Sequence, residues 1–460
     1  MRPSHILLIH SDQHRHDCVG TNGHPLLKTP SLDRLADEGT NFTHAFCPTP
    51  ICVPARVSLL TGAWPTKHGC IFNFDAEVFH PVGSETPAFP ALLREAGYHL
   101  AHVGKWQVDP KRGPLDFGFH EDISDGDYGR WRREQGIPPT PHANRWFGEA
   151  DPYVRPEQTH LAWAAGQVIR LLESRPPGRP LFIQWDPPEP HLPCSPPEPY
   201  ASMYPPEAIP PWPGFRDPLE GKPYIQKQQR RTWKIDGWTW EDWAPAVGRY
   251  MGVVSLMDRQ IGRILDAMDR LHLADETLAV YTTDHGDMCG SHGMIDKHYV
   301  MYDDVVRVPL ILRWPGRIPT RSVCDAFASS AIDVAYTLCE AAGVRPPPTF
   351  GGQSLTSLAR GEAPEPRRDI FSTYSGNQFG LYSQRMVRDR RWKYVWNATA
   401  EDELYDLQAD PGEIHNLARQ KACAGELARL RHRLIDWMQD TGDRLLNQWT
   451  RSQIEEGLKE

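Results

Sequence analysis

Short apolar runs rich in β-branched and aromatic residues alternate with helical patterns through most of the chain. Ile6–His10, His99–Gly104 and Thr277–Thr282 are typical of buried strands, whereas Thr159–Ser174 and Tyr250–Leu271 have the periodicity of amphipathic helices. Such alternation is typical of a parallel sheet, because the connection between parallel strands commonly contains a helix that covers one face. The sequence therefore predicts an α/β fold built on a large, mixed and mostly parallel sheet sandwiched by helices.

Shorter segments extend this pattern. Ser31–Gly39 is predicted to be a helix that Ser31 caps and Gly39 ends, and Leu92–Gly97 is predicted to be a second short helix. Leu181–Trp185 and Val308–Trp314 are predicted strands. The alternation is thus expected to continue to about residue 314.

The pattern changes near residue 365. Prolines and arginines indicate a linker there, and three short predicted strands and one helix follow it: Ile370–Tyr374, Gln384–Arg388, Lys393–Trp396 and, from about Ala424 to Met438, the helix. This order is typical of a small antiparallel sheet with one helix. We therefore expect a large α/β domain at residues 1–365 and a small α+β subdomain at residues 366–460, since the chain is too long for one ordinary domain.

Residues 187–245 form a segment rich in proline and tryptophan. It contains five tryptophans and a basic cluster, namely Trp212, Trp233, Trp238, Trp240 and Trp243 together with Lys222, Lys227, Arg230, Arg231 and Lys234. Long irregular segments inside compact domains are often functional, and these side chains could stack on sugars or attract an anionic glycan. The alternative is a surface insertion that buried tryptophans hold in place.

Composition excludes several classes of protein. The 460 residues carry a formal charge of −9, which argues against general affinity for nucleic acid. The chain contains nine cysteines without a Cys-x-x-Cys pair, which indicates free thiols in a reducing compartment. No apolar run reaches the length of a membrane span, and Ile6–Ile9 is too short for the core of a signal peptide. We therefore expect no membrane or nucleic-acid partner and a cytoplasmic location, with an export signal already removed as the alternative.

Cys52 lies directly before a predicted helix. Pro54 suits the first turn of a helix, where its missing N–H costs nothing, and Gly62 is a typical residue at a helix end. Free N–H groups and the helix dipole favour an anion at such an N-terminus, and the Arg56 guanidinium can bind two oxygens at once. A single cysteine is more often structural, so the rest of the pattern decides between an anion site and a buried thiol.

Two acidic clusters follow predicted strands. Asp12-Gln13 comes directly after the first strand, and Asp284-His285-Gly286-Asp287 follows Thr277–Thr282. Because the carboxyl ends of parallel strands share one edge of a sheet, these clusters are expected to meet. Carboxylates suit a hard divalent cation, and imidazole extends the choice towards manganese or zinc. The sequence thus predicts a metal site at this edge.

The run Cys52-Val53-Pro54-Ala55-Arg56, followed by Thr61-Gly62, resembles the signature of the formylglycine-dependent sulfatases, Cys-x-Pro-(Ser/Ala)-Arg with Thr-Gly downstream. Other segments are similar to further motifs of that family: Gly104-Lys105-Trp106-Gln107, Pro190-His191-Leu192-Pro193, Lys297 before Tyr302–Pro309, Tyr405-Asp406-Leu407 and Asp410–Leu417. Two positions depart from the family. Gln13 replaces an aspartate, as in some bacterial sulfatases and in the related phosphonate monoester hydrolases, and Gln107 replaces a histidine, which leaves the role of position 107 open.

The resemblance implies an alkaline phosphatase-like fold and assigns roles to individual residues. The implied catalytic residues are Cys52, Arg56, Lys105, His191, Lys297 and Asp284; the implied metal ligands are Asp12, Gln13, Asp284 and His285; the implied substrate-binding residues are Arg56, Lys105, His191, Lys297 and, on a weaker match, Asn73. The positive groups would neutralise the sulfate, Asp284 would act as base, and His191 or Lys297 would protonate the leaving oxygen.

In that family a maturation enzyme oxidises the cysteine to formylglycine, that is 3-oxoalanine, whose hydrate attacks sulfur. The resemblance therefore implies a maturation enzyme as partner, formylglycine from Cys52, and one divalent cation, calcium first and manganese second because of His285. The expected function is hydrolysis of sulfate monoesters, on a sulfated carbohydrate or a small ester. Two alternatives remain: a phosphonate or phosphate monoester hydrolase on the same scaffold, and an anion-binding protein without catalysis.

Overall fold

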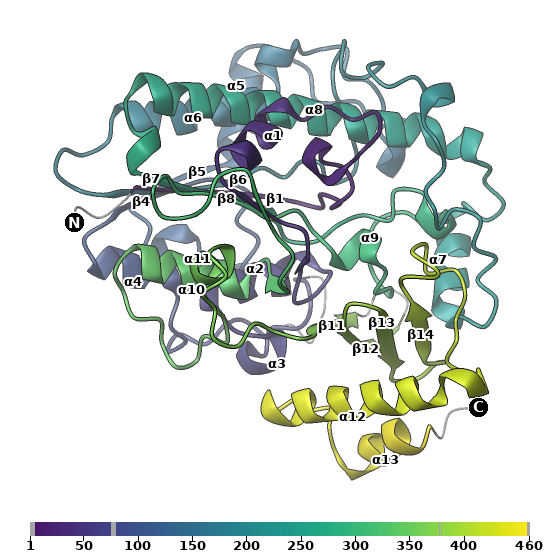
Figure 1. The fold of residues 1–460 in the computed structure, drawn as a ribbon. Helices are drawn as coiled ribbons and strands as arrows, with labels where there is room; N and C mark the ends of the chain where they lie inside the picture. The colour runs from purple at the N-terminus through teal and green to yellow at the C-terminus, as the bar shows by residue number, and fades with distance from the viewer. Residues whose placement is uncertain (1–4, 75–79, 377, 379, 458–460) are drawn as a thin grey trace.

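The computed structural model describes residues 5–74, 80–376, 378 and 380–457. Its centre is an eight-stranded sheet in the order β5-β4-β6-β1-β7-β8-β2-β9 (Figure 1). Neighbouring strands from β5 to β7 are parallel, β8 is antiparallel to β7 and β2, and β9 is parallel to β2. In chain order the strands are β1 His5–Ser11, β2 Thr40–Phe42, β4 His99–Gly104, β5 Glu121–Ser124, β6 Leu181–Asp186, β7 Thr277–Thr283, β8 Ile311–Arg313 and β9 Ser322–Cys324. The predicted mixed, mostly parallel sheet is confirmed.

Helices cover both faces of this sheet (Figure 1). One face carries α1 Pro30–Asp37, α5 Asp125–Glu134, α6 His160–Glu173 and α8 Trp240–Arg270, and the other carries α2 Cys52–Thr61, α3 Pro65–His68, α4 Phe89–Glu95, α10 Ile332–Ala341 and α11 Leu355–Ala359. Alternate side chains of β1 point to opposite faces of the sheet. Leu7 and Ile9 pack in the core with α6 and α8, whereas Ile6 and Leu8 pack in the core on the other face. The continuous apolar runs therefore reflect strands buried on both sides.

Three helix predictions needed correction. The first helix begins at Pro30 instead of being capped by Ser31, and its free N–H groups at Ser31 and Leu32 donate to the Asp258 carboxylate on α8. The helix expected at Tyr250–Leu271 begins ten residues earlier, at Trp240, and continues past Pro245. The helix expected at Leu92–Gly97 lies at Phe89–Glu95.

The last part of the chain forms a second, four-stranded antiparallel sheet with helices below it (Figure 1). Its elements are β11 Ile370–Gly376, β12 Tyr382–Arg388, β13 Trp392–Asn397, β14 Glu403–Asp406, α12 Ala424–Asp440 and α13 Gln448–Glu456. The small antiparallel sheet is confirmed, while β14 and α13 were not predicted. The boundary at residue 365 stays a prediction.

The segment at residues 187–245 is partly helical, since it contains α7 Tyr224–Trp233 and the start of α8. Trp212 and Trp243 are buried, which supports the interpretation that tryptophans hold this segment in place. The predicted basic cluster does not form one surface, because Lys222 is buried against Asp217 and Arg230 donates to the carbonyl oxygen of His292.

Short elements complete the fold: α9 Asp303–Val306 precedes β8, and β3 Ala45–Phe46 pairs with β10 Ala328–Ser329. Within the described residues, none of the helices combines the length and the apolar character needed to cross a bilayer.

Candidate active site

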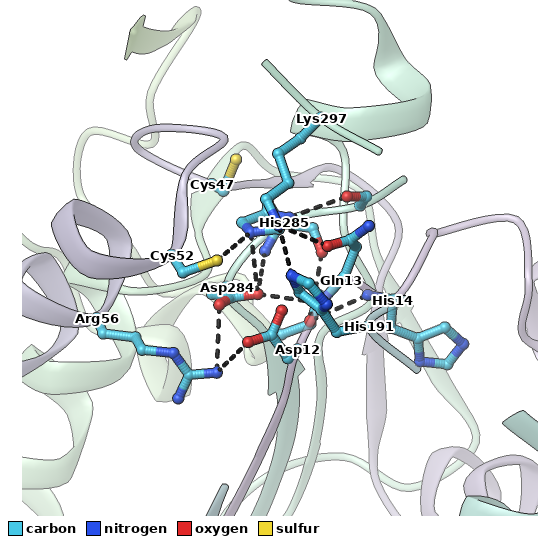
Figure 2. A network of polar contacts seen from close by, with 12 residues as sticks. Asp12, Gln13, His14, Cys47, Cys52, Arg56, His191, Asp284, His285 and Lys297 are labelled. Atoms are coloured by element: carbon cyan, nitrogen blue, oxygen red, sulfur yellow. Dashed lines mark hydrogen bonds and ion pairs between the residues drawn. The ribbon is translucent and has the colours of Figure 1, made fainter. Parts of the chain in front are cut away.

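The predicted site residues gather at the carboxyl edge of the large sheet (Figure 2). Asp12 and Gln13 follow β1, and Asp284 and His285 follow β7, which pairs with β1 in parallel. The other contributors come from the N-terminus of α2, the end of β4, the segment after β6 and the loop before α9; they are Cys52, Arg56, Lys105, His191 and Lys297. Six separate segments of the chain therefore build one site.

Cys52 is the first residue of α2 and is only 1% exposed. Its Sγ lies 3.2 Å from His285 Nε2. Asn73 lies beside the same helix start, where its Oδ1 accepts a hydrogen bond of 3.1 Å from the backbone N–H of Val53. The helix ends at Gly62, whose φ of 61° and contact with the Phe350 ring leave no room for a side chain. The N-terminus of α2 thus places Cys52 in the site, and Asn73 binds one of the free N–H groups of this helix.

Four side chains could hold a metal ion. Ligand atoms of Asp12, Cys52, Asp284 and His285 all lie within 4.8 Å of one another. Asp12 Oδ1 is buried and has no hydrogen-bond partner among the described residues. Because a buried carboxylate oxygen without a partner is costly, this unpaired oxygen fits a bound cation. These four side chains could therefore hold a divalent cation at the edge of the sheet where the sequence predicted a metal site.

Gln13 occupies a different place from the other predicted ligands. It has a left-handed φ of 67°, and its backbone N–H donates to Asp284 Oδ1 at 3.0 Å. Its side-chain carbonyl accepts a 2.7 Å hydrogen bond from Lys297 Nζ, and its amide donates to Asp287 and Asp296. Gln13 thus links the metal-binding edge to the loop that carries Lys297.

Arg56 is fully buried and turned towards carboxylates. Its Nη2 lies 3.0 Å from Asp12 Oδ2 and 3.2 Å from Asp284 Oδ2, and its Nη1 lies 2.9 Å from Asp186 Oδ1. Burial by itself would lower the pKa of Arg56, but these three carboxylates raise it above the usual range. Arg56 therefore holds these three acidic side chains in place.

Lys105 and Lys297 bring two more ammonium groups to the site. Lys105 Nζ contacts Asp12 Oδ2 at 2.5 Å, and Lys297 Nζ lies 2.7 Å from His191 Nε2 and 3.2 Å from Asp296 Oδ1. His191 Nδ1 donates to the carbonyl oxygen of Leu192 at 2.6 Å, so its Nε2 is the acceptor for Lys297. Burial would lower the pKa of Lys297, but nearby anions, Asp296 foremost, raise it.

The two aspartates of the site stay ionised. Burial alone would raise the pKa of Asp12, but Lys105, His191 and Arg56 outweigh it and hold that pKa well below the usual range. For Asp284, burial and the Asp12 charge raise the pKa, whereas His285 and Arg56 lower it below its usual value. The His285 pKa is also lowered, mainly by burial. A neutral imidazole is the form of histidine that binds a metal.

A second polar network behind Arg56 was not predicted from the sequence. Asp186, at the end of β6, accepts from His10 Nδ1 at 2.8 Å and lies 3.2 Å from His102 Nε2. Burial by itself would lower the His102 pKa, but the neighbouring Asp122 and Asp186 carboxylates raise it to about 9. The signal was present in the sequence, since a histidine inside each of two apolar strands and an aspartate at the end of a third are unusual in a buried sheet.

Gln107, where the resembled motif has histidine, has a φ of 43°. Its Oε1 is buried without a hydrogen-bond partner in the described part of the chain. The structure therefore gives no hydrogen bond that would define a role for Gln107 among the described residues.

Comparison with family models, relatives and solved structures gives matches to sulfatases and to a related hydrolase. The family model described as "Sulfatase" matches residues 4–344, and the model described as "N-sulphoglucosamine sulphohydrolase, C-terminal" matches residues 290–440. The chain is 29% identical to an arylsulfatase of Clostridium perfringens, over 95% of this chain and 94% of that protein. It is 24% identical to an N-acetylglucosamine-6-O-sulfatase of Bacteroides thetaiotaomicron, over 96% of this chain and 86% of that protein. Among solved structures, the phosphonate monoester hydrolase of Agrobacterium radiobacter has a TM-score of 0.84 and 28% identity, over 95% of this chain and 96% of that one.

Proposed function

The chain belongs to the sulfatase family, and on that premise we propose that it hydrolyses sulfate monoesters with a nucleophile derived from Cys52 and one divalent cation. The observation that supports this most strongly is the position of Cys52 Sγ, which lies among Asp12, Asp284 and His285 with three basic side chains nearby. A nucleophile, a metal site and a positive environment are what transfer of a sulfuryl group requires.

Asp12, Asp284 and His285 are the proposed metal ligands, with Gln13 as the fourth. Calcium is the proposed ion and manganese the alternative, because His285 supplies a nitrogen to an otherwise oxygen-rich set. When bound, the cation would neutralise the sulfate and lower the pKa of the attacking oxygen. Since the Gln13 carbonyl also accepts from Lys297, this residue could link metal occupancy to the position of that lysine.

The basic residues have separate proposed roles. Lys105 and Lys297 would neutralise the sulfate oxygens, whereas Arg56, which contacts three carboxylates, would mainly hold Asp12 and Asp284 in position. Asp284 is the proposed base. Lys297 donates a hydrogen bond of 2.7 Å to His191 Nε2. Lys297 can therefore give a proton to the leaving oxygen directly, or through His191 after the proton has moved to its Nε2. Asn73 would act through the helix start, where it binds the Val53 N–H.

We propose that a maturation enzyme converts Cys52 to formylglycine. Attack by one oxygen of its hydrate would leave a sulfate ester on a carbon that still bears a hydroxyl. Loss of that hydroxyl proton would expel sulfate and restore the aldehyde, which a serine could not do. Mass spectrometry of the Cys52 peptide tests the conversion, since replacement of the thiol by an aldehyde gives a defined mass loss.

A sulfated carbohydrate is the proposed substrate class, because the relatives include a protein named N-acetylglucosamine-6-O-sulfatase. A phosphonate monoester hydrolase is the second candidate, favoured by the structural match to such an enzyme and by Gln13 and His285. Lys105 favours the sulfatase. Small sulfate esters are the alternative substrate class. A cytoplasmic location is a separate prediction, which cell fractionation would test.

The deciding experiment compares converted protein on sulfated sugars, small sulfate esters and phosphonate monoesters with the same leaving group. The proposal expects the highest kcat/KM on a sulfate ester; a higher value on the matched phosphonate would instead support the second candidate. Exhaustive chelation should abolish turnover and calcium or manganese should restore it. Full turnover in metal-free protein would contradict the metal assignment.

A further inference from the structure

The cluster around Cys52 has a donor set that changes when this residue is converted. Before conversion it offers one sulfur, one imidazole nitrogen and two carboxylates, with their ligand atoms within 4.8 Å. Zinc prefers four-coordinate sites made of sulfur, nitrogen and carboxylate oxygen, whereas calcium takes six to eight oxygens. Replacing the sulfur by an oxygen would therefore move the preference of the site from a soft cation towards a hard one.

We propose that the unconverted protein binds a thiophilic cation, zinc above all, through Cys52, Asp12, Asp284 and His285. Conversion of Cys52 then acts as a switch of metal selectivity as well as the source of the nucleophile. This inference rests on the position of the metal site in the proposed function, and it adds a distinct metal-bound state of the unconverted chain.

Each of the four donors has an open position. His285 Nδ1 donates to the Gly286 carbonyl oxygen at 2.9 Å, which leaves the Nε2 lone pair facing Cys52 Sγ at 3.2 Å. Asp12 Oδ1 and Asp284 Oδ2 have no hydrogen-bond partner among the described residues, and Arg56 Nη2 lies 3.2 Å from Asp284 Oδ2. The hydrogen bond at Nδ1 fixes the ring in the orientation that a histidine ligand needs.

The charges also fit a bound dication. Two carboxylates and a thiolate around a dication sum to one negative charge, and Arg56 and Lys105 both contact Asp12 directly. On binding, the Cys52 thiol would lose its proton to solvent as the sulfur–metal bond forms, with no change of oxidation state. All four side chains are buried, so water would compete poorly for the ion.

Other thiols in the chain lack this arrangement. Cys47, which Figure 2 also labels, is buried, and its Sγ contacts the Val305 carbonyl oxygen at 3.8 Å. Among the described residues, the group that contains Cys52 is the one set of three or more metal-binding side chains that lie close enough to share an ion. Cys47 therefore serves as a matched control: a buried thiol near the site and outside the donor set.

The test uses the full chain produced without a maturation enzyme, stripped of metal and titrated with cobalt(II). The proposal expects a near-ultraviolet thiolate-to-cobalt charge-transfer band and the strong visible absorption of four-coordinate cobalt. Both should be retained in Cys47→Ala and lost in Cys52→Ser. Zinc affinity should fall about a hundredfold in Cys52→Ser, which corresponds to about 3 kcal/mol, while calcium affinity should change little.

X-ray absorption on the zinc-loaded wild-type protein gives a second measurement that needs no variant. One sulfur at about 2.3 Å from zinc is expected. A zinc shell of oxygen and nitrogen alone, a cobalt spectrum without the thiolate band, or equal zinc affinity in wild type and Cys52→Ser would each overturn the inference. These results are independent of turnover by converted protein, so failure of this proposal and failure of the proposed function can be told apart.

Discussion

Lys297 connects the metal-binding edge to the proposed proton donor, so its replacement should slow chemistry far more than it weakens substrate binding. The side chain is 3% exposed, and its Nζ contacts Gln13, His191 and Asp296. Lys297→Met keeps much of the buried volume and removes the charge. Loss of one charged contact that strengthens in the transition state typically lowers kcat by about a hundredfold to a thousandfold, or about 2.7–4 kcal/mol.

The same substitution also breaks a buried ion pair, which typically costs about 3–5 kcal/mol of stability. Asp296 retains a partner, because His298 Nε2 lies 3.3 Å from its Oδ2, so we expect the lower end of that range. Lys393→Met is the matched control. Lys393 is fully buried and its Nζ pairs with Asp303 at 2.6 Å and Glu413 at 2.7 Å, at a place where it contacts none of the predicted catalytic side chains.

Steady-state kinetics on two sulfate esters separates the roles of Lys297. If it supplies the leaving-group proton with His191, the loss of kcat should be larger for an alkyl ester, whose leaving oxygen needs a proton, than for a nitrophenyl ester. Lys393→Met should lose stability in urea unfolding and keep near-normal kcat. Turnover of Lys297→Met within about tenfold of wild type, a change of only about 1.4 kcal/mol in the barrier, would refute this reasoning.

Three further predictions concern the nucleophile, the network behind Arg56 and stability at alkaline pH. Cys52→Ala should fold normally by circular dichroism and have no measurable turnover; wild-type-like rates would contradict the nucleophile assignment. Asp186→Asn should lower kcat more than it raises KM, because Arg56 loses one of three carboxylate partners, and an unchanged kcat would argue against this positioning role. Burial lowers the pKa of His160, but Glu189 and Asp125 raise it to about 10; its contribution to stability is therefore complete below about pH 6.5 and lost as the pH rises through 10. His160→Gln should accordingly flatten the fall in unfolding free energy between pH 7 and 10, and an unchanged slope would contradict the assignment.

The sequence predicted best those strands and helices whose start and end are determined by their own residues. His99–Gly104 was predicted with its observed bounds because this segment is a short run rich in apolar residues and a glycine ends it. The early start of α8 also had a local signal, because Thr239 and Asp242 form a capping box. The backbone N–H of Thr239 donates to the Asp242 carboxylate at 2.8 Å. Pro245 concealed this start, because a proline is normally taken to end a helix.

Features that depend on distant partners could not be predicted in the same way. The start of α1 is satisfied by Asp258, which lies more than two hundred residues further along the chain, so no local pattern identifies the cap. Likewise, the motif shows that Arg56 belongs to the site, but its three carboxylate partners come from three different strand ends. The residues of a site can be inferred from motifs, whereas their pairing follows from the topology of the sheet.

That pairing explains why the site would need a cation to attract a sulfate ester. Arg56, Lys105 and Lys297 supply three positive charges, but they contact four carboxylates, those of Asp12, Asp186, Asp284 and Asp296. The chain as a whole is negative, with a formal charge of −9, so the long-range field does not draw an anion in. A bound dication would make this group of side chains positive and, by neutralising Asp12, would leave Lys105 free to turn from Asp12 to the sulfate. Metal occupancy should therefore control substrate binding as well as the reactivity of the nucleophile.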